Sequence, residues 1–446
     1  MRSRILLGPV LVVPVLVACV GCGSSATPPP SPPPPPAPTA GSTPGPLAPP
    51  DRPMPGPLAT AGAAQSVGEG TRRFAVELWA RLRSRPGNLA VSPGSAWIAL
   101  AMTHAGARTR TEAEMRRVLH MPDDVAATQA EAGALLATWN DASRTAYTLR
   151  VVNRLFGAAG ARFEAPFLAL THGTFRAPLE PVDFAADPEA VRAHINQWVA
   201  QQTQNRISNL LPPRSVDGAT KLVLTNAVYL LARWLSPFTR ESTRDEVFHG
   251  AGGRTETVPT MHMVGPLRLA ELADVQVLEM PYEGGDLAMT LVLPRAQDGL
   301  AAVEAVLDDA TLASWLGAGE TTAVSASLPK FTIDPPEPVP LAEELAAMGM
   351  PTAFDRNAAD FTAMANPPDP RERLFISRVF HKAFVKVDEE GTEAAAATAV
   401  IMAPRGGPPR PTPRPKVFRA DHPFLFFLRD LRSGVVLFAG RVESPR

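Results

Sequence analysis

Apolar residues recur at helical spacing through the first half of the chain. In the first such segment, Phe74, Leu78 and Leu82 share one side of a helix that is expected to end at Pro86-Gly87. The segments with this pattern, each expected to form a helix, are 71–85, 95–107, 111–121 and 188–205.

Later in the chain the pattern changes to short, dense apolar runs of the kind that strands carry. These runs cover residues 221–231, 287–294, 424–430 and 434–442. Several are too continuously apolar to have a solvated face, so we expect them to be central strands. Helices that come first and strands that dominate later indicate an α+β fold, and residues 66–446 are expected to form one domain.

Composition narrows the possible partners. The 446 residues carry 43 Lys and Arg against 44 Asp and Glu, so we expect no nucleic-acid partner and no broad attraction to an anionic surface. Both cysteines, Cys19 and Cys22, lie near the N-terminus. The main body therefore has no thiols for a disulfide or a zinc-thiolate centre, and we expect neither a metal nor a cofactor.

The N-terminus has the pattern of an export signal. Arg2 and Arg4 precede a short apolar run, which ends in the tetrapeptide Leu-Val-Ala-Cys at residues 16–19. This tetrapeptide resembles a bacterial lipobox, which implies a signal peptide over 1–18 and an acylated Cys19. The expected location is the bacterial cell envelope, at the outer membrane or cell surface. Plain secretion is the alternative.

A proline-rich segment follows the cysteines. Residues 28–57 contain 16 prolines, which exclude a regular helix or a strand ladder. We expect residues 19–65 to be a disordered, extended tether between anchor and domain.

Enzyme motifs are missing from the sequence. It contains no G-x-S-x-G, H-E-x-x-H, G-x-x-x-x-G-K-[ST] or G-x-G-x-x-G pattern. Ser92 suits a helix cap better than a nucleophile, while His262 and His381 suit packing in the interior. We therefore expect that the chain is not an enzyme.

Residues 389–407 (EEGTEAAAATAVIMAPRGG) have an ambiguous pattern. Alanine favours a helix, whereas small residues in alternation also suit a strand that enters a crowded sheet. The sequence leaves both states open for the uncut chain.

Seven segments in a fixed order resemble the serpin family of protease inhibitors. Among them are NLAVSPGSAWIALAM, KLVLTNAVYLLARWLSPF, MPYEGGDLAMTLVLP and FHKAFVKVDEEGTEAAAATAV. The resemblance implies three β-sheets, about nine helices, and an exposed reactive-centre loop at about 389–416. It also implies a monomer that traps serine proteases in a covalent acyl complex.

In that mechanism the cleaved loop enters the main sheet as a new strand. Alternate residues from Thr392 to Val400 would then face the core, and none of them is charged. Glu393 would face solvent. The resemblance assigns the hinge to Glu390, Gly391, Thr392, Glu393, Ala394, Ala395, Ala396, Ala397 and Thr398.

The family spacing places the cleaved bond about fourteen residues after the hinge glycine, between Arg405 and Gly406. An arginine at this position implies a trypsin-like protease. Arg410 is the reserve candidate, and the proline-rich segment 406–416 is longer than the family pattern leads us to expect.

Further residues match positions that the family uses to control the opening of the sheet. Ser92, Ser95, Asn226 and His381 match the shutter beneath the main sheet, and Trp234 matches the breach where insertion begins. Two alternatives to an inhibitor remain. One is a non-inhibitory serpin that acts as a binding or chaperone-like envelope protein, which the small hinge residues disfavour. The other is a hydrolase, which the missing motifs disfavour.

Overall fold

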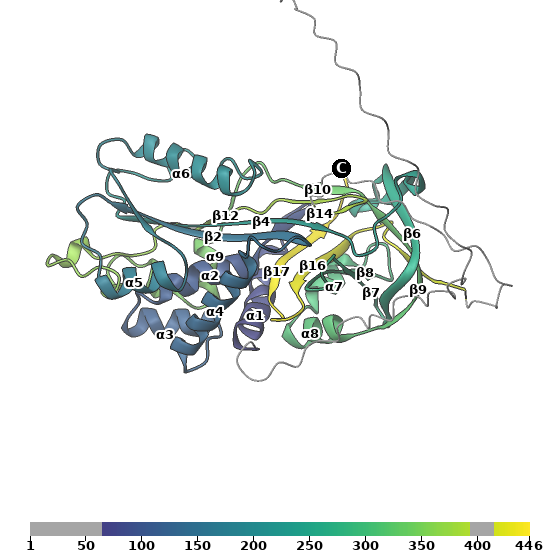
Figure 1. Cartoon of the computed structure of the whole chain (residues 1–446), viewed down its shortest axis with the longest axis horizontal. Helices are drawn as coiled ribbons and strands as arrows, with labels where there is room; N and C mark the ends of the chain where they lie inside the picture. The colour runs from purple at the N-terminus through teal and green to yellow at the C-terminus, as the bar shows by residue number, and fades with distance from the viewer. Residues whose placement is uncertain (1–64, 393–413) are drawn as a thin grey trace, which may run out of the picture. The chain divides into compact units, whose positions relative to one another are not determined.

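The computed structural model describes residues 65–392 and 414–446. This part of the chain contains nine α-helices and three β-sheets (Figure 1), so the expected α+β class is confirmed. The helices are α1 (Gln65–Leu82), α2 (Pro93–His104), α3 (Thr109–Val118), α4 (Val125–Trp139), α5 (Ala165–Gly173), α6 (Pro188–Gln202), α7 (Leu300–Ala305), α8 (Asp309–Gly317) and α9 (Ala342–Met348).

The largest sheet follows the order β1-β17-β16-β8-β7-β6-β9-β15, with β5 paired to β6. Its strands are β1 (Leu89–Val91), β5 (Arg244–His249), β6 (Thr255–Glu271), β7 (Val275–Pro281), β8 (Leu287–Pro294), β9 (Glu320–Pro329), β15 (Lys416–Arg419), β16 (Phe424–Asp430) and β17 (Val436–Val442).

The second sheet has six strands in the order β10-β13-β14-β4-β2-β3. They are β2 (Tyr147–Ala158), β3 (Leu179–Val182), β4 (Leu222–Arg233), β10 (Phe331–Ile333), β13 (Val385–Val387) and β14 (Gly391–Thr392). The third sheet pairs β11 (Val339–Pro340) with β12 (Phe380–His381).

Three of the four predicted strands lie at the centre of the largest sheet. All residues of β8 and β17 are buried, as are all but one of β16, which confirms that these apolar runs form central strands. The fourth run forms β4, whose residues are mostly half-buried. Because β14 pairs only with Ala232 and Arg233, most of that edge of β4 has no strand partner in the described part of the chain.

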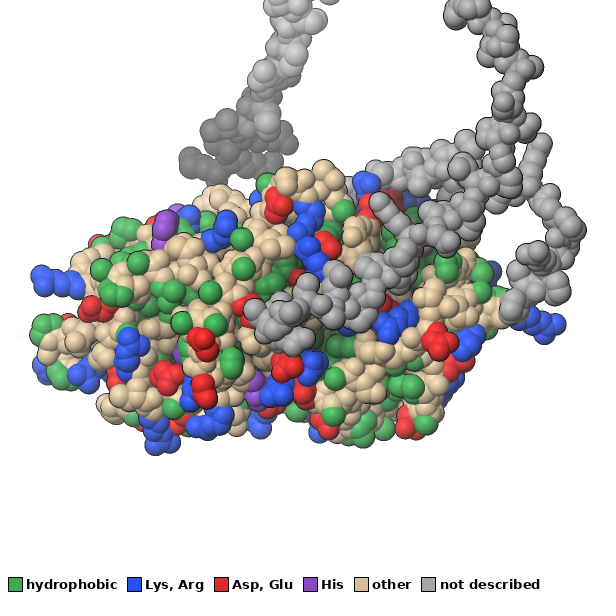
Figure 2. Space-filling model, turned by 60° about the horizontal axis from the view of Figure 1, so that its bottom comes forward, with side chains coloured by type: hydrophobic (Ala, Val, Ile, Leu, Met, Phe, Trp, Pro, Cys, Tyr) green, Lys and Arg blue, Asp and Glu red, His purple; other side chains and the backbone are tan. Residues whose placement is uncertain are grey.

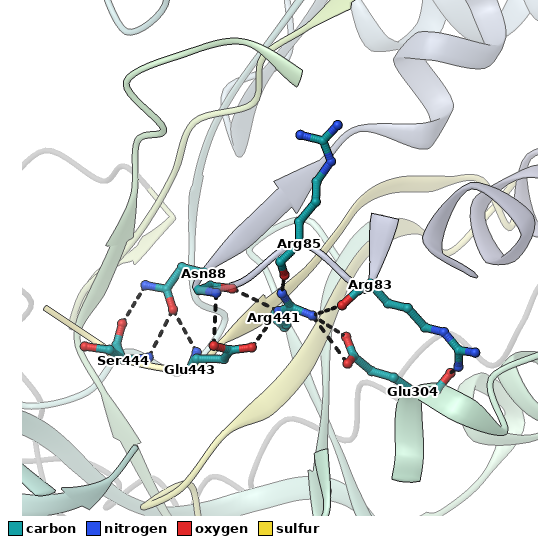
Figure 3. A network of polar contacts seen from close by, with 8 residues as sticks. Arg83, Arg85, Asn88, Glu304, Arg441, Glu443 and Ser444 are labelled. Carbon is teal, nitrogen blue, oxygen red and sulfur yellow. Dashed lines mark hydrogen bonds and ion pairs between the residues drawn. The ribbon is translucent and has the colours of Figure 1, made fainter. Parts of the chain in front are cut away.

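Helix α1 ends earlier than the sequence predicts. Its pattern continues to Arg85, but the helix stops at Leu82. The guanidinium of the buried Arg441, on β17, donates to the carbonyls of Arg83 (2.7 Å), Arg85 and Gly87 (2.9 Å). Figure 3 shows these bonds converging on Arg441. A side chain more than 350 residues away thus satisfies carbonyls after the helix end that the helical pattern cannot.

The same arginine pairs with a buried carboxylate on α7. Arg441 Nη1 lies 3.1 Å from Glu304 Oε1, and Arg83 donates to the Glu304 carbonyl at 2.6 Å. Burial raises the pKa of Glu304, and Arg441 opposes that rise. We call this cluster of Arg83, Glu304 and Arg441 the C-terminal clamp, because it fixes β17 to the end of α1 and to α7.

The surface matches the near-zero net charge. On the face shown in Figure 2, Lys and Arg side chains are interspersed with Asp and Glu side chains, and no broad area of one sign is visible. No helix within residues 65–392 and 414–446 has the length and apolar character that crossing a membrane requires.

Candidate functional site

The six-stranded sheet has a gap next to β4. The short strand β14 sits between β13 and β4 and pairs Gly391 with Arg233 and Thr392 with Ala232. From Leu222 to Leu231, no strand of the described chain pairs with that edge of β4. A cavity of about 500 Å³ lies there, lined by 222–226 of β4, by 371–381, and by side chains of α2.

Backbone crowding explains the glycine at the top of the gap. Gly391 has φ +155°, and a Cβ built on it would lie 2.0 Å from the Ala232 carbonyl oxygen and 2.8 Å from the Arg233 Cα. Any side chain would therefore push β14 away from β4. Gly391 is where the chain can turn closely against β4 and enter the sheet.

Thr392 already lies inside the sheet. Its side chain is buried, and its hydroxyl lies 2.6 Å from the Tyr282 hydroxyl. The Tyr282 ring stacks on Trp234 with centroids 4.5 Å apart, and the Trp234 indole donates to the Asp388 carbonyl at 3.0 Å. Trp234, placed by resemblance at the breach, is thus connected to the hinge residue Thr392 through the Tyr282 ring.

Charged groups close the same end of the gap. Glu389 accepts from Lys330 Nζ, 2.9 Å from its nearer oxygen, and from Thr243 Oγ1 at 2.9 Å. Burial alone would raise the pKa of Glu389, but these bonds outweigh it and hold the pKa below its usual range. Glu390 pairs with the more exposed Arg240 at 2.6 Å. The buried carboxylate is therefore ionised at neutral pH and joins the residue before β10 to the residue before the hinge.

The four predicted shutter residues come together at the other end of the gap. The Ser92 amide donates to His381 Nε2 at 2.8 Å, and the Ser92 hydroxyl donates to the Leu437 carbonyl at 2.6 Å. Ser95 donates to Asn226 Oδ1. These bonds connect the start of α2 to β12, β17 and β4, three strands from three different sheets.

His381 is a neutral structural group at this junction. Because Nε2 accepts a hydrogen bond from the Ser92 amide, the ring carries its own proton on Nδ1. Burial lowers the pKa of His381 to about 4, so the ring stays neutral at pH 7. Ser92 also caps α2, accepting from the Ser95 amide at 3.4 Å, as the sequence predicted.

Sequence reasoning missed several members of the site. Asn153 accepts from Asn226 Nδ2 at 2.7 Å from the directly opposite position on β2. Tyr282, Lys330 and Glu389 were not singled out either. The sequence did offer a signal for the pair of Asn153 and Asn226, because each asparagine interrupts an apolar strand pattern. No local pattern indicates that Lys330 pairs with Glu389 or that Tyr282 bonds to Thr392, because folding brings these residues together from distant parts of the sequence.

Other predicted positions lie apart from the site or outside the described residues. His262, expected to pack, lies 3.0 Å from Ser327 Oγ and 3.3 Å from Glu246 on the largest sheet. The described residues hold no cluster of three His, Cys, Asp or Glu side chains suited to a metal ion. Cys19, the tether, hinge positions 393–398 and the Arg405-Gly406 bond fall outside the described residues.

A family model described as serpin, serine protease inhibitor, matches residues 69–445. The chain belongs to the serpin family. Its match to pig leukocyte elastase inhibitor is 39% identical and covers 84% of this serpin and 98% of that protein.

Solved structures agree with the fold. A cleaved serpin, Serpin 42Da, superposes with a TM-score of 0.75 at 29% identity, covering 86% of this chain and all of that one. Human thyroxine-binding globulin in complex with thyroxine gives a TM-score of 0.74 at 25% identity over 86% of this chain and all of the globulin. The proteins that this chain resembles therefore include both an elastase inhibitor and a thyroxine-binding globulin.

Proposed function

We propose that this serpin inhibits trypsin-like serine proteases by inserting its cleaved loop into the six-stranded sheet. The observation that carries the proposal is the gap beside β4, with Gly391 and Thr392 already paired at its top. The protease would cut after Arg405 and form an acyl-enzyme through its own serine. The freed segment would then fill the gap before the ester is hydrolysed.

The observed pairing supports one register for insertion. Thr392 lies opposite Ala232, so an antiparallel continuation brings Thr398 opposite Asn226 and Val400 opposite Leu224. Thr392 is buried, so the alternate residues through Val400 would also face inward. Thr398 would thus arrive at the shutter, where its hydroxyl can bond with the Asn226 side chain.

The sequence of the inserting segment fits this register. Inward positions from Ala394 to Val400 are small or β-branched and uncharged, while Glu393 would face solvent. About ten new ladder bonds at about 1 kcal/mol each give on the order of 10 kcal/mol. This is comparable to the total stability of a domain, and it suffices to distort a protease that is dragged along.

The placement at the envelope is also part of the proposal. An acylated Cys19 and a tether of roughly 40 residues that includes the proline-rich segment 28–57 would hold the inhibitor near a bacterial membrane, at a distance of up to about 120 Å. Growth with labelled palmitate would mark the wild-type protein. A Cys19→Ser variant would lose the label and leave the membrane fraction.

Mixing the serpin with trypsin tests the inhibitor directly. We expect a complex that survives boiling in detergent, and Arg405→Ala should abolish it. Arg410→Ala is the matched control and should leave the complex intact. Cleavage by trypsin with no complex in the wild type would favour a non-inhibitory serpin.

A second variant separates insertion from recognition of the bait. Thr392→Arg leaves Arg405 untouched but places a charge where Thr392 is buried against Tyr282. Trypsin should still cut this variant and be released, whereas Thr392→Ser should trap as well as wild type. Trapping by Thr392→Arg at the wild-type stoichiometry would contradict loop insertion.

A further inference from the structure

The cavity beside β4 has an apolar interior and a cationic opening. Its leucine, isoleucine, valine, phenylalanine and methionine residues are all buried or half-buried. They include Leu100 of α2, Leu224 of β4 and Leu345 of α9. The charged residues of the lining are all exposed, so they surround the opening. These are Lys221, Arg356, Arg371, Arg373, Arg378, Asp217 and Glu372.

Nearby carboxylates offset only part of the positive charge at this opening. Arg371 is paired with Asp369 at 2.7 Å. Arg373 lies within electrostatic range of Asp360. Asp217 accepts hydrogen bonds from the amide and hydroxyl groups of its own turn, so its carboxylate is already occupied.

Three cations of the opening remain without a carboxylate partner. Lys221, Arg356 and Arg378 form no ion pair with the described residues. Arg378 donates instead to the Arg214 carbonyl at 3.0 Å, which leaves its charge unneutralised. The guanidinium of Arg356 lies 5.9 Å from the centroid of the Phe375 ring, and that ring lines the cavity. An anionic group at the opening would therefore meet cations where the apolar wall begins.

The cleaved loop would account for the apolar interior but not for the cations. If the register of β14 continues, Ala403 would lie opposite Lys221. Residues 394–403 contain no carboxylate, and Arg405 follows two positions later. Insertion would thus bring one more cation to the opening. An occupant that matches both the interior and the opening needs an apolar body and an anionic end.

We propose that the cavity binds a free long-chain fatty acid, with its acyl chain between β4 and α2 and its carboxylate among Lys221, Arg356 and Arg378. The cavity volume of about 500 Å³ is typical of small-molecule sites. This inference rests on the proposed inhibitory function, because the acyl chain would occupy the place that Thr398 and Val400 take on insertion. With the ligand bound, water would hydrolyse the acyl-enzyme before insertion is complete. The serpin would then be a substrate of trypsin rather than an inhibitor.

Calorimetry with two single-chain ligands tests the site directly. Dodecanoate and dodecyltrimethylammonium carry chains of equal length and opposite charge, and both are used below their micelle concentrations. We expect dodecanoate to bind with a Kd on the order of ten micromolar and the cation to bind at least about tenfold more weakly. Lys221→Gln/Arg356→Gln should weaken dodecanoate binding about tenfold, since each exposed ion pair contributes a few-fold. Arg371→Gln is the matched control, because Asp369 already pairs with that cation.

Two further samples test whether the ligand lies inside the cavity. Ala99→Leu fills the cavity from α2 and should abolish binding while melting no lower than wild type. Serpin that thermolysin has cut before Ile401, and whose melting temperature has risen, should not bind, because residues up to Val400 then fill the cavity. In the uncut serpin, saturating dodecanoate should at least double the number of serpin molecules consumed for each trypsin trapped.

The outcomes separate the ligand from the inhibitor. If wild type traps trypsin but does not bind dodecanoate, the fatty-acid site is overturned and the inhibitor stands. Equal binding of the two ligands, or equal dodecanoate binding by wild type and Lys221→Gln/Arg356→Gln, would also overturn the site. So would binding that persists in Ala99→Leu or in the cut and stabilised serpin. If wild type traps no trypsin even without ligand, the proposed function fails, and regulation by the fatty acid fails with it. Binding that each variant weakens as expected, together with the higher consumption of serpin, would support the proposal.

Discussion

The two large sheets of this serpin are held together by different kinds of interaction. Strands β8, β16 and β17 of the nine-stranded sheet are almost completely buried and apolar. Strand β4 of the six-stranded sheet is mostly half-buried. Polar groups bond beside it at two places, at Thr392 next to its last residues and at Asn226 within the strand.

The difference indicates which sheet can change. Apolar burial is lost in proportion to the area that is opened, so parting β8 from β16 would be costly along its whole length. Hydrogen bonds can be exchanged, because an entering strand supplies new partners for those it displaces. The polar hydrogen bonds next to β4 are therefore suited to being exchanged when a strand enters the six-stranded sheet. The apolar nine-stranded sheet is suited to keeping its strands together.

Cutting the loop should have the largest effect, and only on the six-stranded sheet. Thermolysin is a suitable tool, since it cuts before apolar residues such as Ile401 and its zinc mechanism forms no acyl-enzyme. Insertion worth on the order of 10 kcal/mol should raise the melting temperature of a domain of this size by roughly 13 °C. Calorimetry of intact and nicked protein measures this shift. If the nicked form melts no higher than the intact protein, insertion of the cut segment does not stabilise the fold.

Breaking the C-terminal clamp should lower stability without affecting inhibition. Arg441→Met leaves Glu304 buried and unpaired, which should cost about 3–5 kcal/mol in urea unfolding. The stoichiometry of trypsin trapping at 25 °C should stay at the wild-type value. Arg85→Met is the matched control, because only the backbone carbonyl of Arg85 bonds to Arg441 (Figure 3). Loss of trapping in folded Arg441→Met would show that the two sheets are coupled.

Acid should weaken the shutter. The pKa of His381 is about 4 in the folded protein and about 6.5 in the unfolded chain, so the unfolded state binds the proton first. The contribution of neutral His381 to the free energy of unfolding is therefore fully present above pH 6.5. It falls by about 3 kcal/mol as the pH drops toward 4. Urea unfolding at pH 7 and pH 4.5 measures the loss. His381→Gln should flatten this dependence, and an unchanged slope would contradict the assignment.

The smallest effect is expected at the upper end of the gap. Glu389→Gln weakens the bonds from Lys330 and Thr243 and should cost about 1.5 kcal/mol. Because the pKa of Glu389 is lower in the folded protein than in the unfolded chain, this carboxylate stabilises the fold at pH values above its unfolded pKa. That stabilisation is lost as the pH falls through its folded pKa. Glu390→Gln is the control. Its partner Arg240 is 63% exposed, so the change should be within about 0.5 kcal/mol.

The sequence predicted local structure better than junctions. Apolar runs identified β8, β16 and β17 because these strands are buried on both faces, and helical spacing located α2, α3 and α6. The end of α1 was wrong by several residues, since Arg441 acts there from the other end of the chain.

Within the site, the family resemblance supplied the shutter and breach positions. It did not supply Asn153, which bonds to Asn226, or Tyr282, which stacks on Trp234 and bonds to Thr392. Nor did it supply the ion pair of Lys330 with Glu389. Each of these hydrogen bonds and the ion pair joins residues more than 50 positions apart. A periodic pattern carries no information about which distant residues become neighbours, so the pairs emerged only with the fold.

The pairing of β1 with β17 also affects how the protein is made. Leu89 lies opposite Arg441, so a strand near the start of the domain has no partner until the last segments are translated. At about 5–20 residues per second, a ribosome needs roughly 20–70 s to cover that distance. During this interval β17 is not yet available to cover the apolar residues of β1 and α2. We therefore expect chaperones to bind these exposed apolar residues while the chain is being synthesised.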